Sequence, residues 1–298
     1  MKQQTLKKEY RFEGRGLHTG LYSHLTLKPA DQNSGIKFVR TDLGVEIPAL
    51  AEYVTNTSRC TLISKGDASV STIEHLMSAL TGLGVDNALI EVDNGEVPIL
   101  DGSARYFVEA IATDGLEVQD ADRIYIEIPK EVEVQYGNTG SYIRVEPADH
   151  FSLDVTVDFN SRVLGVQEAH WDESIDYCKE VAPCRTFCFL HEVMYLAAQG
   201  LVKGGSVDNA IVVVEHPVKD EDLAKLAALF NQPKLEVTPE GYLSNLTLNF
   251  PDECGRHKLL DLIGDIRLVG GYPKAHIVAY KPGHTLNTDT AKTLRKLL

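Results

Sequence analysis

The chain lacks any excess of positive charge and any long apolar run. Its 298 residues include 43 acidic and 29 basic side chains, which gives a formal net charge of −14 at pH 7. Nucleic acids and anionic membrane surfaces attract basic proteins, so this balance argues against both as the main partner. No stretch approaches the roughly 20 apolar residues that a membrane span needs. We therefore expect no stable insertion into a membrane.

Paired cysteines and a secretory signal are also missing. The five cysteines, at positions 60, 178, 184, 188 and 254, lack the even number and regular spacing of a disulfide framework. Cys184 and Cys188 are four residues apart, but no second Cys or His pair completes a tetrahedral metal site with them. The first residues, Met-Lys-Gln-Gln-Thr-Leu-Lys-Lys-Glu, contain no apolar signal core. We expect a cytoplasmic protein with reduced thiols.

Internal repeats and low-complexity segments are absent as well, and the chain is long enough for two ordinary domains. Strand-like runs mixed with helical stretches in both halves predict layered α+β domains. The polar segment 116–122 marks the expected boundary, which gives domains 1–122 and 123–298. The expected strands are Tyr22–Leu27, Gly35–Val39, Ala88–Val92, Ile124–Ile128, Glu131–Gln135, Tyr142–Val145 and Phe151–Val157, and the expected helices lie near 72–82, 103–114, 173–180, 221–230, 255–265 and 288–297.

The first candidate site is the stretch His-Lys-Leu-Leu-Asp-Leu-Ile-Gly-Asp at 257–265. In a helix, His257, Asp261 and Asp265 would share one face, because each is four residues from the next. A His and an Asp one turn apart can bind one metal ion from a rigid support. Asp265 can orient a ligand or another catalytic group. An amphipathic helix with a polar face toward solvent explains the same spacing.

Two further motifs contain a histidine. Glu74 and His75 stand at the start of an otherwise apolar helix, for which Ser71 or Thr72 is the expected cap. Burying this pair costs solvation free energy, which metal binding by His75 would offset. A capping carboxylate beside a satisfied core histidine is the alternative. His284 follows the strand-like run 277–280 and is expected in a loop, where it can act as an acid or an electrostatic stabiliser.

These motifs together resemble the UDP-3-O-acyl-N-acetylglucosamine deacetylases of lipid A biosynthesis. The chain contains, in order, Gly16-Leu17-His18-Thr19-Gly20, Glu74-His75, Asp86-Asn87, Ile99-Leu100-Asp101-Gly102-Ser103, Arg185-Thr186-Phe187, Gly204-Gly205-Ser206, Asp208-Asn209-Ala210, His257-Lys258 with Asp261 and Asp265, and Gly283-His284 with Asn287. The resemblance covers essentially the whole chain. In some bacteria this deacetylase is fused to a hydroxyacyl-carrier-protein dehydratase, and the N-terminal sequence here resembles those fusions. Whether this chain is the deacetylase part of such a fusion stays open.

The resemblance implies two α+β domains with the active site between them, and a zinc ion held by His75, His257 and Asp261. It implies that Glu74 is the general base, and that His284, held by Asp265, is a cation or acid. The other implied site residues are Thr186 for the oxyanion, Lys258 for positive charge near the site or the diphosphate, and Phe159, Phe187 and His18 for substrate binding. Phe159 is followed by Ser-Arg-Val at 161–163, where the family has His-Pro.

The resemblance also implies a βαβ insert near 189–214 that encloses a passage for the acyl chain. The apolar side chains that fit this lining, or ordinary core packing, are Leu190, Val193, Met194, Leu196, Ala197 and Leu201. The segment 216–253 has no functional interpretation from the sequence. The candidates for a locally basic diphosphate site are Arg185, Lys203, Arg256, Lys258 and Lys281.

We thus expect a zinc-dependent deacetylase that acts as a monomer on UDP-3-O-acyl-N-acetylglucosamine. Two alternatives stay open. One is another zinc amidase that acts on N-acetyl sugars. The other is a non-catalytic nucleotide-sugar binding protein with a degenerate site, which the intact ligand set and Glu74 argue against.

Overall fold

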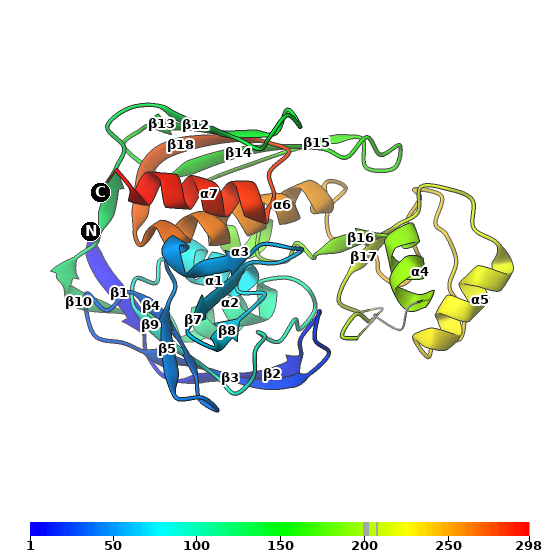
Figure 1. Cartoon of the computed structure of the whole chain (residues 1–298), viewed down its shortest axis with the longest axis horizontal. Helices are drawn as coiled ribbons and strands as arrows, with labels where there is room; N and C mark the ends of the chain where they lie inside the picture. Colours follow the sequence, from blue (N-terminus) through cyan, green and yellow to red (C-terminus); the bar gives the residue numbers. More distant parts are fainter. Residues whose placement is uncertain (199–202, 207, 298) are drawn as a thin grey trace.

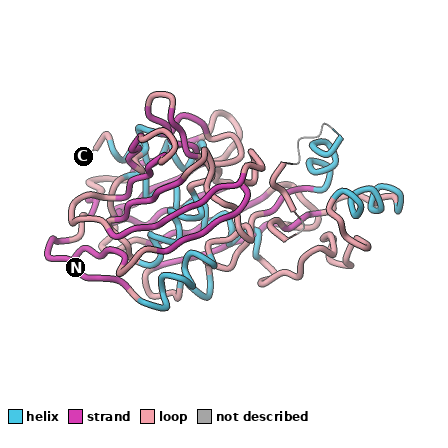
Figure 2. The backbone as a smooth tube through the Cα atoms, turned by 90° about the horizontal axis from the view of Figure 1, so that it is seen from below, coloured by secondary structure: helices cyan, strands magenta, loops and turns pink. Residues whose placement is uncertain are grey.

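The computed structural model describes residues 1–198, 203–206 and 208–297 (Figure 1). The first part of the chain forms a sheet with the strand order β2 (Tyr10–Arg15), β3 (Tyr22–Pro29), β9 (Ala88–Val92), β4 (Ile36–Arg40) and β5 (Val45–Pro48). Figure 2 shows these strands side by side in front of the helices. Alternate residues, such as Leu25 and Leu27, are buried because successive side chains of a strand point to opposite faces. Beside this sheet are β6 (Val54–Asn56), β7 (Leu62–Lys65) and β8 (Ala68–Val70), which pair with one another.

A second sheet comes from the later part of the chain. Its strand order is β12 (Val132–Gln135), β13 (Tyr142–Pro147), β18 (Tyr272–Tyr280), β14 (Ser152–Asp158) and β15 (Val166–Asp172), with β11 (Tyr125–Glu127) parallel to β18. The last strand, β18, therefore enters the middle of the sheet, antiparallel to β13 and parallel to β14.

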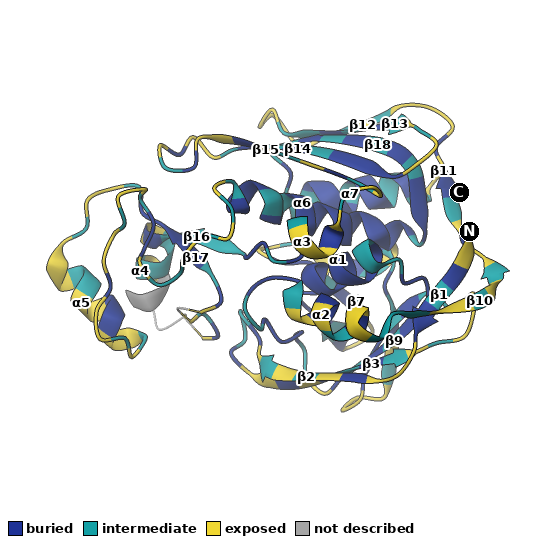
Figure 3. Ribbon diagram, turned by 180° about the vertical axis from the view of Figure 1, so that it is seen from behind, coloured by how far each residue is buried: buried dark blue, intermediate teal, exposed yellow. Residues whose placement is uncertain are grey.

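Helices lie between the two sheets, and Figure 3 shows that α1 (Glu74–Leu83) and α6 (Glu253–Ile266) are largely buried there. The others are α2 (Arg105–Asp114), α3 (Tyr177–Glu180) and α7 (His284–Arg295). α1 and α6 approach closely at Gly264, where a Cβ atom would lie 2.1 Å from the carbonyl oxygen of Glu74. Only glycine allows these backbones to pass so near each other.

A smaller lobe projects from this body on the side away from both termini (Figure 1). β16 (Phe187–Phe189) runs parallel to β17 (Ile211–Val213), with α4 (Leu190–Ala198) between them in the chain. α5 (Asp220–Leu229) follows and lies farthest from the body. This is a βαβ unit at the place where the insert is expected. Leu201 lies outside the described residues, as do the side chains of Leu196 and Ala197.

The α+β prediction is confirmed, and most expected elements appear within a few residues of their predicted bounds. The polar boundary segment forms β10 (Leu116–Asp122), which pairs with β1 (Lys2–Leu6). The division into domains at this point stays a prediction. The helix expected at 173–180 is only the short α3, because Asp176 caps it by accepting bonds from the N–H groups of Cys178 and Lys179. Across the described part of the chain, every helix is too short or too polar to cross a membrane.

Candidate active site

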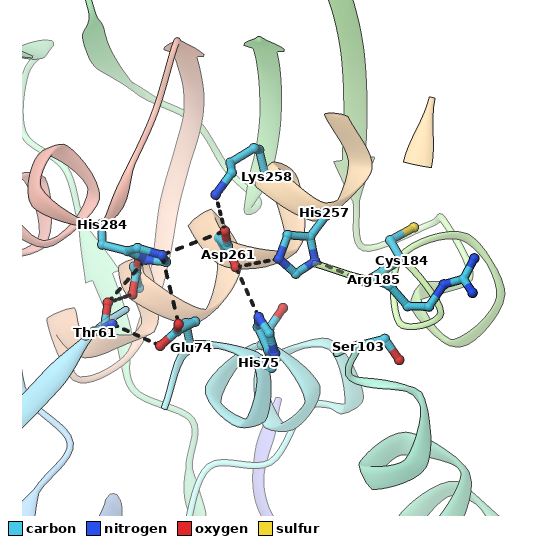
Figure 4. A network of polar contacts seen from close by, with 12 residues as sticks. Thr61, Glu74, His75, Ser103, Cys184, Arg185, His257, Lys258, Asp261 and His284 are labelled. Atoms are coloured by element: carbon cyan, nitrogen blue, oxygen red, sulfur yellow. Dashed lines mark hydrogen bonds and ion pairs between the residues drawn. The ribbon is translucent and has the colours of Figure 1, made fainter. Parts of the chain in front are cut away.

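Two helices far apart in the sequence bring three metal-ligating side chains together (Figure 4). α1 carries His75, and α6 carries His257 and Asp261 one turn apart. Asp261 Oδ1 lies 3.5 Å from His75 Nε2 and 3.4 Å from His257 Nε2. The two imidazole rings meet edge to face, with 4.9 Å between their centroids. All three residues are buried.

The electrostatics of these residues fit a divalent metal ion. Asp261 Oδ1 is buried and accepts no hydrogen bond from any described residue, which is costly for a carboxylate oxygen unless a cation compensates. His257 Nδ1 donates to the carbonyl oxygen of Cys184 at 3.0 Å, so Nε2 keeps its lone pair toward Asp261. Burial lowers the pKa of His257 to about 3, which keeps the imidazole neutral as a ligand must be.

Whereas His257 is kept neutral, Asp261 is kept ionised. Burial opposes its ionisation, but the positive charge of Lys258 beside it helps to hold the pKa of the carboxyl well below its usual range. Lys258 Nζ donates to the other oxygen, Oδ2, at 2.7 Å. Two imidazoles and one carboxylate are the ligand set of open catalytic zinc sites. Of all described residues, these form the one group of at least three His, Cys, Asp or Glu whose ligand atoms lie within 4.8 Å of one another.

Glu74 is the first residue of α1 and lies beside these ligands. Burial raises the pKa of its carboxyl. Oε2 accepts the N–H of Thr61 at 3.0 Å, and Oε1 lies 3.9 Å from His284 Nε2. The expected cap is wrong, because α1 begins after Ile73 without a side-chain cap. The Thr72 hydroxyl donates to Glu96 instead, at 2.8 Å.

His284 is held by the carboxylate of Asp265, which Asn287 and Thr61 hold in turn. Its Nδ1 donates to Asp265 Oδ2 at 3.0 Å, and Asn287 Nδ2 donates to the same oxygen at 2.9 Å. The Thr61 hydroxyl donates to Asp265 Oδ1 at 2.6 Å. Burial alone would lower the pKa of His284, but the carboxylates of Asp265 and Glu74 outweigh it and raise the pKa to about 9. The expected loop position is wrong, because His284 is the first residue of α7.

These groups open into a cavity of about 530 Å³. It is lined by Leu17, His18, Arg59, Thr72, Glu74, His75, Thr186, Phe187, Cys188, Glu192, Val193, Lys203, Gly205, Ser206, Ala210, Val212, Phe230, Leu243, Asn245, His257, Lys258, Asp261 and His284. His18 Nε2 is buried in this lining and has no hydrogen-bonding partner in the described structure. Burial lowers the pKa of His18, so its imidazole is neutral.

Four residues predicted to bind substrate do not line the cavity. Phe159 lies outside the lining and packs edge to face on Phe187, with 5.4 Å between the ring centroids. Among the basic candidates, Arg185 is buried against Glu253, and Arg256 pairs with Glu180 and Asp252. Lys281 pairs with Asp158 at 3.1 Å. The basic side chains that line the cavity are Lys203, Lys258 and Arg59.

Sequence reasoning missed three residues at the site: Arg59, Thr61 and Glu96. Glu96 is buried and accepts the backbone N–H groups of His18 at 2.9 Å and Thr19 at 2.8 Å. With its bond from Thr72, it joins the turn at 16–20 to the residues just before α1. In the sequence, Asn-Gly-Glu at 94–96 is typical of an exposed turn. No local signal marks these residues, because their partners are distant in the chain.

The site combines a two-histidine, one-carboxylate group that could hold a metal ion with a buried glutamate, which is the kind of site found in metal-dependent hydrolases. The chain belongs to the UDP-3-O-acyl N-acetylglycosamine deacetylase family (LpxC), whose model matches residues 3–230 and 233–296.

Named relatives are similar over nearly the whole chain. A bifunctional enzyme LpxC/FabZ from Bacteroides thetaiotaomicron is 44% identical over 99% of this chain, and its counterpart from Porphyromonas gingivalis is 43% identical over 99%. The chain spans 65% and 64% of the lengths of these two relatives. A UDP-3-O-acyl-N-acetylglucosamine deacetylase from Teredinibacter turnerae is 41% identical over 99% of this chain and 91% of its own length.

Proposed function

We propose that the chain is a zinc-dependent deacetylase that releases acetate from UDP-3-O-acyl-N-acetylglucosamine. The observation that carries the proposal is the buried, unpartnered oxygen of Asp261 between two histidines, in one cavity with Glu74 and His284. Membership of the family and the name of the Teredinibacter relative support this substrate.

His75, His257 and Asp261 would hold the zinc ion. When bound there, zinc would act as a Lewis acid that lowers the pKa of a water molecule and polarises the amide carbonyl. Cys184 and Lys258 support the ligands through the hydrogen bonds at His257 Nδ1 and Asp261 Oδ2. Both bonds fix the orientation of a ligand, which is a known requirement for tight metal binding.

The remaining chemistry is proton transfer by this chain's own side chains. The Glu74 carboxylate accepts a proton from the attacking water. Thr186 lines the cavity, and its hydroxyl would donate a hydrogen bond to the oxyanion that forms. His284 is protonated at neutral pH and can stabilise that oxyanion or donate a proton to the nitrogen as the C–N bond breaks. The products are acetate and the free amine of the sugar.

The cavity has apolar and basic lining residues, and each kind suits a different part of the substrate. The apolar side chains of the lobe would take the 3-O-acyl chain, and Arg59, Lys203 and Lys258 would face the negative diphosphate. His18 and Phe187 line the same cavity and would contact the sugar nucleotide. Phe159 would act from outside by packing on Phe187.

We also propose that the enzyme acts in the cytoplasm, since all five cysteines are free. The monomeric state stays a prediction, which light scattering can test. The domain boundary at residue 122 also stays a prediction, which limited proteolysis can test.

The test is acetate release from UDP-3-O-acyl-N-acetylglucosamine. We expect turnover that a chelator abolishes and that added zinc restores. Unacylated UDP-N-acetylglucosamine and free N-acetylglucosamine serve as comparison substrates. Both should react far more slowly, because neither has an acyl chain to contact the apolar lining. Each buried methylene of such a chain contributes ~0.8 kcal/mol of binding free energy before ordering costs. Equal turnover of the acylated and unacylated sugars would favour a general amidase. No acetate from any of them, with zinc bound, would refute the proposal.

A further inference from the structure

The cavity has two chemically different ends. α1 and α6 supply the charged and polar side chains at one end. The lobe supplies apolar side chains at the other, including Val193 from α4, Val212 from β17, and Phe230 and Leu243 from the segment that follows. Figures 1 and 3 agree that β16, β17 and α4 lie next to the body, and that α5 lies beyond them. The largest of these four side chains directly follows α5.

Phe230 is that side chain, and its position is well anchored. It is the C-terminal cap of α5, and its N–H donates to the carbonyl oxygen of Leu226 at 3.0 Å. Leu226 is buried in the core of the lobe, against which the Phe230 ring is packed. Leu243, which lines the same end of the cavity, is held in place because its N–H donates to the carbonyl oxygen of Val212 at 2.9 Å. Rotation of the Phe230 ring out of the cavity would cost these packing contacts.

A second hollow borders the same strand and helix. It has a volume of about 1060 Å³ and is lined by Val214, Ala227 and Ala228, among others. On the strand side, Val212 lines the first cavity and Val214 the second. On the helix side, Phe230 lines the first cavity, whereas Ala227 and Ala228 line the second. Val212 and Val214 are two residues apart and belong to one apolar cluster, so the two hollows are neighbours on the same side of this strand. At the first hollow the α5 segment presents the large ring of Phe230, and at the second it presents two small alanines.

We propose that Phe230 is the end stop of the acyl-binding arm and sets the longest acyl chain that the enzyme accepts. This rests on the proposed function and identifies a specificity residue within it. A chain that reaches the ring cannot pass it, because the ring is packed against the core of the lobe. A smaller residue at position 230 would extend the arm toward the second hollow, and a larger one would shorten it.

The test is kcat/KM for a series of UDP-3-O-acyl-N-acetylglucosamines that differ only in acyl length. In Phe230→Ala we expect the optimum to move to longer chains. Each methylene that newly finds room should raise kcat/KM by up to about fourfold, the equivalent of ~0.8 kcal/mol per buried methylene. In Phe230→Trp the optimum should move to shorter chains. The control is Leu229→Ala, because Leu229 is the preceding residue but is 52% exposed; its length profile should match the wild type.

The comparison is made between substrates within one preparation, so partial misfolding lowers all rates without moving the optimum. Identical length profiles for the wild type, Phe230→Ala and Phe230→Trp would overturn the end-stop role, even if the wild type is an active deacetylase. A shift in the same direction for both variants would overturn it as well. Wild-type protein that releases acetate at no chain length would instead refute the proposed function.

Discussion

Replacing Gly264 with alanine should weaken both the fold and the metal site. The new Cβ would lie 2.1 Å from the carbonyl oxygen of Glu74 and 3.0 Å from the backbone nitrogen of Ser78. Both atoms belong to the backbone of α1, so neither can rotate away, and α1 and α6 must move apart. Overpacking of a core costs ~1–3 kcal/mol, and a backbone clash should reach about 3 kcal/mol of unfolding free energy. At 2–4 °C per kcal/mol, Tm should fall by roughly 6–12 °C.

The same displacement separates the metal ligands, because His75 lies on α1 whereas His257 and Asp261 lie on α6. We expect zinc affinity to fall about 10–100-fold, the usual loss when ligand orientation is disturbed. Thermal unfolding and zinc titration against a chelating dye measure the two effects. Gly14→Ala is the matched control, because its Cβ would meet its nearest neighbour, the side chain of Pro98, at 3.4 Å. If Gly264→Ala had the same Tm and zinc affinity as Gly14→Ala, this account of the contact between α1 and α6 would be refuted.

Three further predictions concern individual site residues. Glu74→Gln should keep its zinc but lose roughly 10²–10⁴-fold in kcat; near-normal turnover would remove Glu74 as the base. His257→Ala should lose most of its zinc by elemental analysis, because only two protein ligands remain; near-stoichiometric zinc would reject the ligand assignment. The pH–rate profile should be a bell that rises as Glu74 ionises, above the ordinary range of a glutamate, and falls as His284 loses its proton near pH 9. His284→Ala should lose the falling limb, and an unchanged limb would assign it to another group.

The sequence by itself determined the local features of this protein. The four-residue spacing of His257, Asp261 and Asp265 predicts one helical face, and all three lie on α6. Strand bounds such as Ala88–Val92 follow from short apolar runs. Both depend on backbone geometry, which repeats every 3.6 residues in a helix and every two in a strand. The types of chemical group at the site were therefore readable from the chain.

Tertiary structure alone decided which of these local features meet. The approach of α1 to α6 at Gly264 places His75 beside His257. Asp261 Oδ1 lies next to both rings and receives no hydrogen bond from the described residues. Thr61 and Glu96 join the site only through hydrogen bonds to distant residues. Phe230 lines the cavity only because α4, β17 and α5 pack on one another. Such contacts depend on the packing free energy of the whole core, to which every element contributes, whereas local sequence spacing reports only the backbone period of one element.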